Sequence, residues 1–187
     1  MNVEIRKLTT ELLDDYLHFF DTHEDCYCVC YASDNHEGKD FSQKETRRNH
    51  AAQYVKDGMI QGYLAYWDNQ VVGWCNANSK KNCLKCEGWN VMLSAVSTKE
   101  SANGKVKSIF CFTVAPDMRR KGISTQLLKQ VCKDAAIDGF DCIEVYPNRE
   151  FKDTFSDHMG PIDFFKKHGF VLYEEAGKKV VMRKELQ

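Results

Sequence analysis

The sequence predicts an α/β protein that folds as one domain over residues 1–187, and three observations support this. Residues Val106–Val114 are rich in β-branched and aromatic side chains, which is typical of a strand covered on both faces. A tight basic turn follows, and apolar residues then recur at helical spacing from Ile123 to Ala135. A length of 187 residues gives one domain enough material for a hydrophobic core.

The turn between this strand and this helix, Arg119-Arg120-Lys121-Gly122-Ile123-Ser124, has the composition of an anion-binding site. The first N–H groups of a helix lack intrahelical partners, and the positive end of the helix dipole lies behind them. Gly122 lacks the Cβ that would hinder a close approach, and three consecutive cations add positive charge. The pattern predicts a pyrophosphate-binding turn. Taken alone, it is equally typical of a solvated helix cap.

The remaining elements are predicted from periodicity, caps and turn residues. Residues 79–104 are the least informative part, where Trp89–Val96 is either one more strand or an insertion over a binding cleft. The other predicted elements are strands at 2–8, 62–67, 70–78, 142–146, 171–174 and 179–184, and helices near 9–23, 42–58 and 161–169.

Charge and composition exclude several classes of protein. The formal net charge is -1, so no overall basic field draws the chain to nucleic acid or to a membrane. The N-terminal residues carry charges at once and form no long apolar run, which argues against a signal peptide and a transmembrane helix. The 9 cysteines are odd in number and mostly lie within apolar patterns, which fits a reduced, cytoplasmic protein better than a disulfide scaffold.

The cysteines allow three interpretations. Cys26, Cys28 and Cys30 could supply zinc ligands together with Cys83 and Cys86 if the fold brings them together. However, the C-x-C-x-C spacing alternates like a strand, so ordinary buried thiols are the preferred interpretation and we predict no metal. A catalytic cysteine would need a histidine beside it, and no histidine is constrained to lie there.

Two stretches resemble a known family. The turn R-R-K-G-I-S resembles the R/Q-x-x-G-x-G/A loop of the GNAT superfamily of acyl-CoA-dependent N-acyltransferases, and the preceding F-C-F-T-V-A-P-D is similar to that family's central strand. Farther on, Phe164–Phe170 resembles the family's closing helix and its terminal Gly-Phe. The resemblance is specific over Val106–Leu186, and before that it concerns only the expected order of elements.

This resemblance implies a single-domain fold with a mixed, mostly antiparallel and twisted sheet of about seven strands flanked by helices. It also implies acetyl-CoA as the co-substrate, wedged between the fourth and fifth strands. The backbone of the fourth strand would hold the pantetheine arm, as an added strand would, and the basic turn would wrap the pyrophosphate. The residues implied in cofactor binding are Phe112, Thr113, Val114, Arg119, Arg120, Lys121, Gly122, Ile123, Ser124 and Thr125.

The implied reaction transfers an acetyl group to a primary amine by direct attack in a ternary complex. Such an attack needs a neutral amine and a proton for the departing thiolate. The family often places a tyrosine four residues before the terminal glycine, where this chain has Phe165, and an asparagine seven residues earlier, which becomes His158. Glu144 is then the best candidate for the base, although a surface or salt-bridged role is the alternative, and Glu87 is a weaker candidate. Tyr146, on the same face of its strand as Glu144, is the candidate proton donor.

A one-sided hairpin face indicates where the acceptor binds. Alternation along residues 71–78 puts Trp74 and Asn76 on one face, which is either a recognition surface or the polar end of an edge strand. With Cys28, and with the segment Cys26–Tyr31 as a lid, they form the predicted acceptor site. The acceptor is expected to be a small-molecule or peptide amine, and the protein a monomer or a homodimer.

Two other functions stay open. The phenylalanine at position 165 is compatible with a GNAT-like module that binds and senses acyl-CoA without turnover. The cysteine groups are compatible with a zinc-stabilised interaction protein. Protection by coenzyme A without product would favour the first, and a stoichiometric metal would favour the second.

Overall fold

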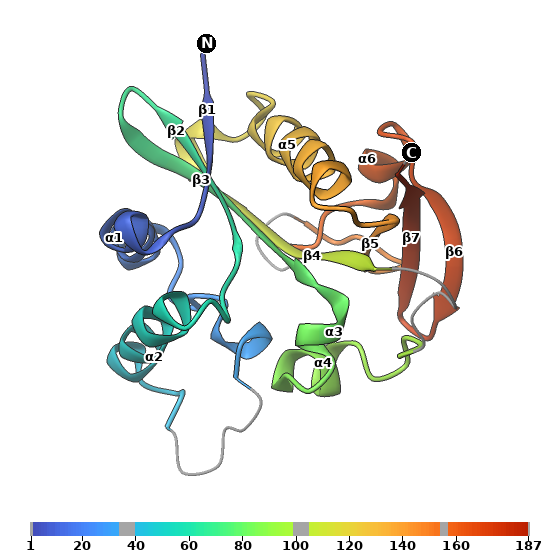
Figure 1. Ribbon diagram of the computed structural model, residues 1–187, viewed down its shortest axis with the longest axis horizontal. Helices are drawn as coiled ribbons and strands as arrows, with labels where there is room; N and C mark the ends of the chain where they lie inside the picture. The colour runs from blue at the N-terminus through green and yellow to red at the C-terminus, as the bar shows by residue number, and fades with distance from the viewer. Residues whose placement is uncertain (1, 34–39, 99–104, 154–156, 187) are drawn as a thin grey trace.

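The two longest strands, β3 (Gln70–Ser79) and β4 (Val106–Val114), lie side by side at the centre of the molecule in the computed structural model (Figure 1). The structure describes residues 2–33, 40–98, 105–153 and 157–186. The strands form one sheet in the order β1-β2-β3-β4-β5-β7-β6, whose pairings are antiparallel apart from β4–β5. This confirms the predicted α/β class and the mostly antiparallel sheet. The other strands are β1 (Glu4–Lys7), β2 (Gly62–Trp67), β5 (Cys142–Val145), β6 (Val171–Ala176) and β7 (Lys179–Glu185).

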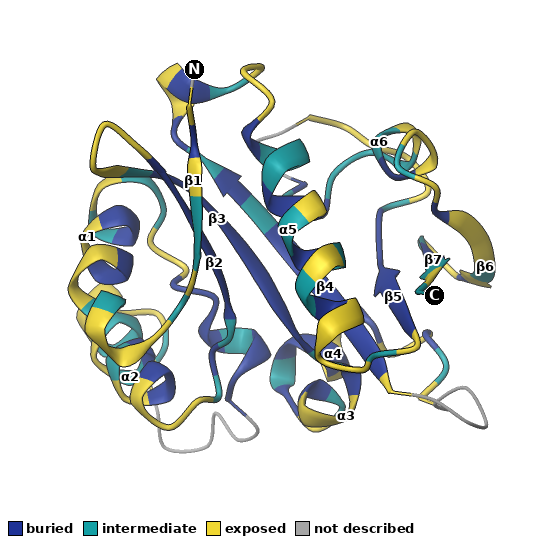
Figure 2. Cartoon of the chain, turned by 45° about the horizontal axis from the view of Figure 1, so that its top comes forward, coloured by how far each residue is buried: buried dark blue, intermediate teal, exposed yellow. Residues whose placement is uncertain are grey.

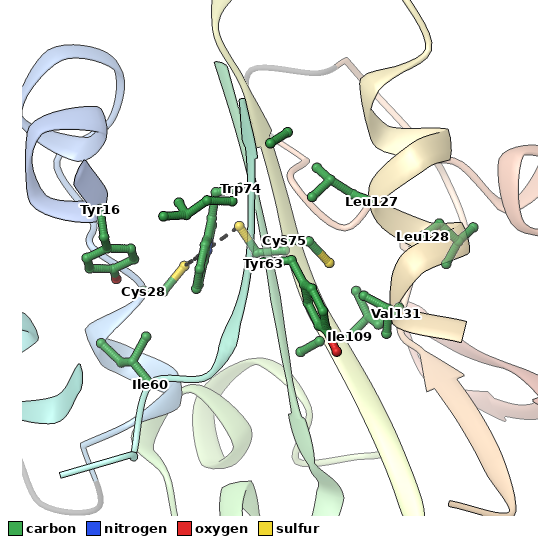
Figure 3. Close-up of a cluster of buried hydrophobic side chains, with 14 of the residues drawn as sticks. Tyr16, Cys28, Ile60, Tyr63, Trp74, Cys75, Ile109, Leu127, Leu128 and Val131 are labelled. Carbon is green, nitrogen blue, oxygen red and sulfur yellow. Dashed lines mark hydrogen bonds between the residues drawn. The ribbon is translucent and has the colours of Figure 1, made fainter. Parts of the chain in front are cut away.

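Helices cover both faces of the sheet. Tyr16 of α1 packs on one side of β3, and Leu127 and Leu128 of α5 pack on the other (Figure 3). None of the helices in the described ranges is long and apolar enough to cross a membrane. The α-helices are α1 (Leu13–His23), α2 (Lys44–Lys56), α3 (Lys80–Cys83), α4 (Glu87–Met92), α5 (Ile123–Ile137) and α6 (Ile162–Lys166). The 3-10 helices are η1 (Thr10–Leu12), η2 (Val29–Tyr31) and η3 (Pro116–Met118).

The apolar stripe predicted for the central helix is the face that α5 buries. Leu127, Leu128 and Val131 are fully buried and point toward Tyr63 and Cys75 of the sheet (Figure 3). Residues on the opposite side of α5 are of intermediate burial or exposed (Figure 2). Each large apolar side chain buried in this way stabilises the fold by roughly 1.5–3 kcal/mol, so this stripe fixes α5 and the turn at its N-terminus against the sheet.

A fork opens where β4 and β5 separate. The two strands pair in parallel only as far as Ile109 and Val145, whereas β4 continues to Val114. On its other side β4 carries an irregularity: Cys111 pairs with Asn76 while Ile109 pairs with the next residue of β3. The residue between them on β4 is therefore an extra one, as in a β-bulge. Past the fork, the edge of β4 that faces β5 lacks a neighbouring strand among the described residues.

Two predicted segments have a different structure. Trp89–Val96 is not a strand: it begins inside α4, which packs against η2, and residues 99–104 lie outside the described ranges. The segment Cys26–Tyr31 is a turn followed by η2, and Tyr27 and Cys28 have positive φ values of 48° and 49°. Cys26 is exposed, Cys28 is buried and Cys30 is intermediate. The three cysteines therefore do not share one face. Burial does not alternate along the segment either, since Tyr27, Cys28 and Val29 are all buried.

Candidate active site

A hollow of about 480 Å³ lies where the C-terminal end of β4 meets the N-terminus of α5. It brings together two stretches for which the sequence predicted cofactor binding, one from the strand and one from the basic turn. The predicted residues on its wall are Phe112, Thr113, Val114, Arg119, Arg120, Gly122, Ile123, Ser124 and Thr125. Such a volume is within the range of small-molecule sites.

The first turn of α5 has the geometry of an anion site. Arg120 and Gly122 both have left-handed backbone conformations, with φ of 65° and 81°, so the chain curls before the helix begins at Ile123. Gln126 donates a hydrogen bond to the Gly122 carbonyl at 3.1 Å, which leaves the N–H groups of the three residues before Gln126 without helical partners. With the helix dipole behind them, these groups can bind a phosphate.

Gly122 is required by its backbone conformation rather than by crowding within the protein. A Cβ built on Gly122 would meet no protein atom within 4 Å, and it would project into open space beside the hollow. L-amino acids with side chains rarely adopt a φ of 81°. A larger side chain would therefore strain the turn and occupy space next to the N–H groups.

The three cations of the turn occupy different places. Arg119 and Arg120 line the hollow, and Arg119 Nε donates a hydrogen bond to the Val114 carbonyl at 3.2 Å. Lys121, also predicted to bind the cofactor, is not among the wall residues, and its Nζ is 3.5 Å from Met118 Sδ. Met118 itself lines the hollow, so the Lys121 ammonium lies just behind its wall.

The free edge of β4 faces the hollow. The Phe112 N–H donates a hydrogen bond to the His158 carbonyl at 2.7 Å, so this N–H points away from β3. Backbone groups of a strand alternate in direction, and Val114 therefore presents its backbone to the same edge. Both positions predicted to hold a pantetheine arm thus lie on the hollow, and the chain before α6 already occupies the Phe112 donor.

Glu144 lies fully buried in the middle of β5. Its Oε1 accepts hydrogen bonds from Arg183 Nη2 at 2.6 Å and Arg183 Nε at 3.2 Å. Its Oε2 accepts from Lys80 Nζ at 2.9 Å and from the Tyr146 hydroxyl at 3.1 Å. Arg183 stands directly opposite on β7. A carboxylate held by two buried cations is an ion-pair centre, so the geometry favours the salt-bridged alternative for Glu144 over a role as base.

Tyr146 follows β5 directly after the fork. Its hydroxyl lies 2.6 Å from Ser108 Oγ, and its ring stacks on Phe110 with 5.7 Å between the centroids. Burial raises the pKa of the Tyr146 phenol well above its ordinary value, and the charge of Glu144 adds to this. Tyr146 is therefore protonated at neutral pH, and it does not line the hollow.

The predicted acceptor residues lie in the core on the α1 side of the sheet. Trp74 is fully buried, its ring meets Tyr16 edge-on at 5.0 Å, and its Nε1 donates a hydrogen bond to Cys28 Sγ at 3.3 Å (Figure 3). Asn76 is buried on the same strand, and none of the predicted acceptor residues lines the hollow. The structure brings Trp74 and Cys28 together as core residues, because an indole ring and a thiol pack as largely apolar groups.

The sequence profile of the family described as "Acetyltransferase (GNAT) family" matches residues 20–170. The chain belongs to the GNAT acetyltransferase family. Among curated protein sequences, no significant match is found. Among solved structures, the chain is similar to PaiA N-acetyltransferase from Thermoplasma acidophilum, a complex with coenzyme A, with 19% identity, a TM-score of 0.58 and 99% of each chain covered. It is also similar to Drosophila melanogaster polyamine N-acetyltransferase, an enzyme that forms N-acetylagmatine, with 12% identity, a TM-score of 0.59 and coverage of 99% of this chain and 100% of that one. At such identities these likenesses show the GNAT fold.

Sequence reasoning missed two sets of residues around this GNAT site. Phe151 and Phe164 lie on the wall of the hollow; Phe151 lies in no sequence motif, and Phe164 lies in the closing-helix motif but was not predicted to bind a ligand. Lys80 and Arg183, which hold Glu144, lie 64 and 39 residues away from it in the chain. A charged residue in the middle of a buried strand, such as Glu144, does indicate that a partner of opposite charge exists. A basic residue on an adjacent strand, as Arg183 is, would be the partner to search for.

The two cysteine groups meet at η2. The Cys83 and Cys86 thiols each donate a hydrogen bond to the Tyr31 carbonyl, at 3.7 Å and 3.1 Å. In the described parts of the chain, no three His, Cys, Asp or Glu side chains are grouped as a metal ion would need. The thiols near η2 thus act as hydrogen-bonding members of the core.

Proposed function

We propose that this chain transfers the acetyl group of acetyl-CoA to a primary amine, by direct attack in a ternary complex. The observation that carries the proposal is the hollow at the N-terminus of α5, where unpaired N–H groups, Arg119 and Arg120 converge. Membership of the GNAT acetyltransferase family and the likeness to a structure that contains coenzyme A support it.

The residues present fit coenzyme A as a co-substrate. The first turn of α5 would hold the pyrophosphate through its N–H groups, and the two arginines would add charge-assisted bonds. The aromatic rings of Phe112 and Phe164, 6.0 Å apart, would contact the pantetheine arm along the free edge of β4. In this arrangement the thioester points toward the apex of the fork, at Ile109 and Val145.

The chemistry needs two proton movements. The amine nitrogen forms a bond to the thioester carbonyl carbon, the carbon–sulfur bond breaks, the nitrogen loses a proton and the thiolate gains one. Tyr146, next to the apex, is our candidate donor to the thiolate. The carboxylate oxygens of Glu144 already accept bonds from Arg183, Lys80 and Tyr146, so we assign it to positioning Tyr146. A proton from the amine would then pass to water.

The acceptor belongs to the small-molecule or peptide amines. Polyamines and agmatine are the first to test, because a structurally similar protein is a polyamine N-acetyltransferase. The cysteines of the structure are free thiols, which supports action in a reducing, cytoplasmic setting. The expected assembly is a monomer or a homodimer.

The experiment is a screen of amines with acetyl-CoA that monitors release of free thiol. Spermidine, agmatine, amino acids and a lysine-containing peptide represent the acceptor classes. We expect at least one of them to release thiol faster than buffer alone, and the double variant Arg119→Ala/Arg120→Ala to raise the KM for acetyl-CoA. Binding of acetyl-CoA by calorimetry without thiol release for any amine would favour the sensing module instead.

A further inference from the structure

A second hollow, of about 380 Å³, lies at the opposite end of β3 and β4 from the coenzyme A hollow. Its wall includes Lys7 at the end of β1, Lys56 at the end of α2, Tyr63 at the start of β2 and Lys107 at the start of β4. Lys107 and Phe112 are five residues apart on β4, which corresponds to roughly 17 Å at about 3.3 Å per residue. The two hollows are therefore separate sites.

Lys107 is buried, and no described carboxylate is in direct contact with its ammonium group. It is only 3% exposed, and its ammonium group lies 5.1 Å from the centroid of the Phe140 ring. No ion pair is formed by Lys107 within the described residues. Lys80 is equally buried but contacts the carboxylate of Glu144 at 2.9 Å. Buried cations are normally paired in this way, so Lys107 lacks the partner that Lys80 has.

The wall around Lys107 carries positive charge, and one of its hydroxyl groups lacks a hydrogen-bond partner among the described residues. Lys7 and Lys56 add two cations to the wall, and the described wall contains no aspartate or glutamate. The nearby acid Asp138 forms an ion pair with Lys7 at 3.2 Å. The Tyr63 hydroxyl is buried and has no hydrogen-bond partner in the described part of the chain. The Asp134 carboxylate lies near Tyr63, where its charge adds to burial in raising the pKa of the phenol, and it accepts a bond from Gln130 at 2.9 Å.

We propose that this second hollow binds a small polyanion, a ligand whose phosphate or carboxylate groups face Lys107, Lys7 and Lys56. Such a ligand would supply the counter-charge that the fold leaves out. It would also offer an acceptor to the hydroxyl groups of the wall. The hollow has the volume of a site for a small metabolite rather than for a macromolecule. Burial lowers the pKa of Lys107, and an anion beside it would reverse that effect.

The test uses pyrophosphate as the phosphate probe and citrate as the carboxylate probe, each by calorimetry at fixed ionic strength. The N-terminus of α5 also attracts anions, so the titrations compare three proteins: the parent, Lys107→Met, and the double variant Arg119→Ala/Arg120→Ala. We expect Lys107→Met to lower the affinity for at least one probe by about tenfold or more. The double variant should bind the same probe with an affinity within about twofold of the parent. The probe that responds distinguishes a phosphate ligand from a carboxylate ligand.

The methionine retains most of the lysine stem and removes a buried charge, so Lys107→Met is expected to fold, which a thermal melt checks. If Lys107→Met does not fold, Lys7→Met is the second variant. Lys7→Met should also lower the affinity for the probe that binds. Absence of binding to the parent at millimolar probe would overturn the proposal, as would affinities unchanged in both lysine variants. A loss confined to the double arginine variant would assign the anion to the coenzyme A hollow and would also overturn it. Failure of acetyl transfer leaves these titrations unaffected, so the two proposals fail separately.

Discussion

One buried carboxylate organises the β5–β7 end of the sheet. Glu144 is fully buried and forms ion pairs with both Lys80 and Arg183, which are themselves buried. It also accepts a hydrogen bond from Tyr146, which in turn contacts Ser108 on β4. Removing one partner of such a centre leaves the other charges unpaired in a medium where unpaired charges are costly. A substitution at Glu144 is therefore expected to lower the free energy of unfolding.

We expect Glu144→Gln to lower the free energy of unfolding by about 3–5 kcal/mol, because two buried cations lose their counter-charge. Chemical denaturation of the variant and the parent measures this. Glu185→Gln is the matched control: Glu185 lies on the same strand as Arg183 and 4.0 Å from it, but it is exposed, so its loss should cost under about 1 kcal/mol. A stable Glu144→Gln protein whose plateau rate falls and whose pH profile loses its acidic limb would instead identify Glu144 as the base.

The glycine of the basic turn gives the sharpest test of the coenzyme A hollow. Gly122→Val should weaken acetyl-CoA binding by more than about tenfold, because it disturbs the N–H groups as a set, whereas Arg120→Ala removes one exposed cation and should cost less. Gly139→Val is the control, since Gly139 also has a left-handed φ, of 72°, with no protein atom within 4 Å of an added Cβ, but it lies at the other end of α5. Calorimetry on folded proteins decides this. Affinity within about twofold of the parent in Gly122→Val would refute the site.

Phe165 stands where the family often has a tyrosine, and it is a core residue. It is fully buried, and its ring contacts Phe164 and Phe170 at centroid distances of 5.1 Å and 5.6 Å. Phe165→Leu should therefore cost about 1–2 kcal/mol of stability through lost volume. The pH dependence of kcat should be unchanged, because no proton-transferring group is removed. A shifted profile in the leucine variant would show that this position affects the chemistry.

The role of a residue was predictable where the residues that form its site are contiguous in the sequence. It was not predictable where the site includes residues that are distant in the sequence. The basic turn could be assigned because its glycine, its cations and the helix behind it are contiguous. The role of Trp74 could not be predicted, because the alternating pattern of a strand face is the same whether a ligand or a helix covers that face. In the structure, Tyr16 of α1 and Cys28 cover Trp74. The role of Glu144 depended on Lys80 and Arg183, whose proximity no local pattern encodes.

At the scale of elements, the chain before α6 lies against the free edge of β4. The His158 carbonyl accepts the Phe112 N–H at 2.7 Å, the donor that a pantetheine arm would use. Coenzyme A should therefore displace the His158 carbonyl when it binds. We expect the amide signals of Met159 and Gly160 to shift in nitrogen–proton NMR spectra on titration with coenzyme A, while those of β6 stay in place. Unchanged signals at both residues, with coenzyme A bound, would show that the arm takes another path.

The long central elements were predictable, and the two short helices α3 and α4 were not. The strand at 106–114 and the helix that follows it coincide closely with β4 and α5, because the strand has a long run of β-branched and aromatic residues and the helix has a clear apolar period. α3 and α4, of 4 and 6 residues, are too short to show a helical period. Their positions depend on contacts with η2, and such tertiary contacts override local preference.

At the scale of the whole molecule, the fold separates its thiols from the proposed chemistry. Cys28 and Cys75 are buried. Burial raises the pKa of Cys30 to about 12 and that of Cys142 to about 11, so both are protonated at neutral pH. The Cys111 thiol beside Cys28, together with burial, raises the pKa of Cys28 well above its ordinary value. Because the thiolate is the nucleophile, these thiols are poorly suited to accept an acetyl group.

Acetyl transfer should therefore proceed without an acetyl-enzyme. With an acceptor found in the amine screen, initial rates measured over both substrates should give intersecting lines in double-reciprocal plots, as a ternary complex requires, and not the parallel lines of a ping-pong reaction. Mass spectrometry after incubation with acetyl-CoA alone should show unmodified protein. Cys30→Ala, which removes a partly accessible thiol, should leave kcat within about twofold of the parent. Parallel lines together with a stable acetylated cysteine would contradict direct attack and would make the acetylated thiol the nucleophile.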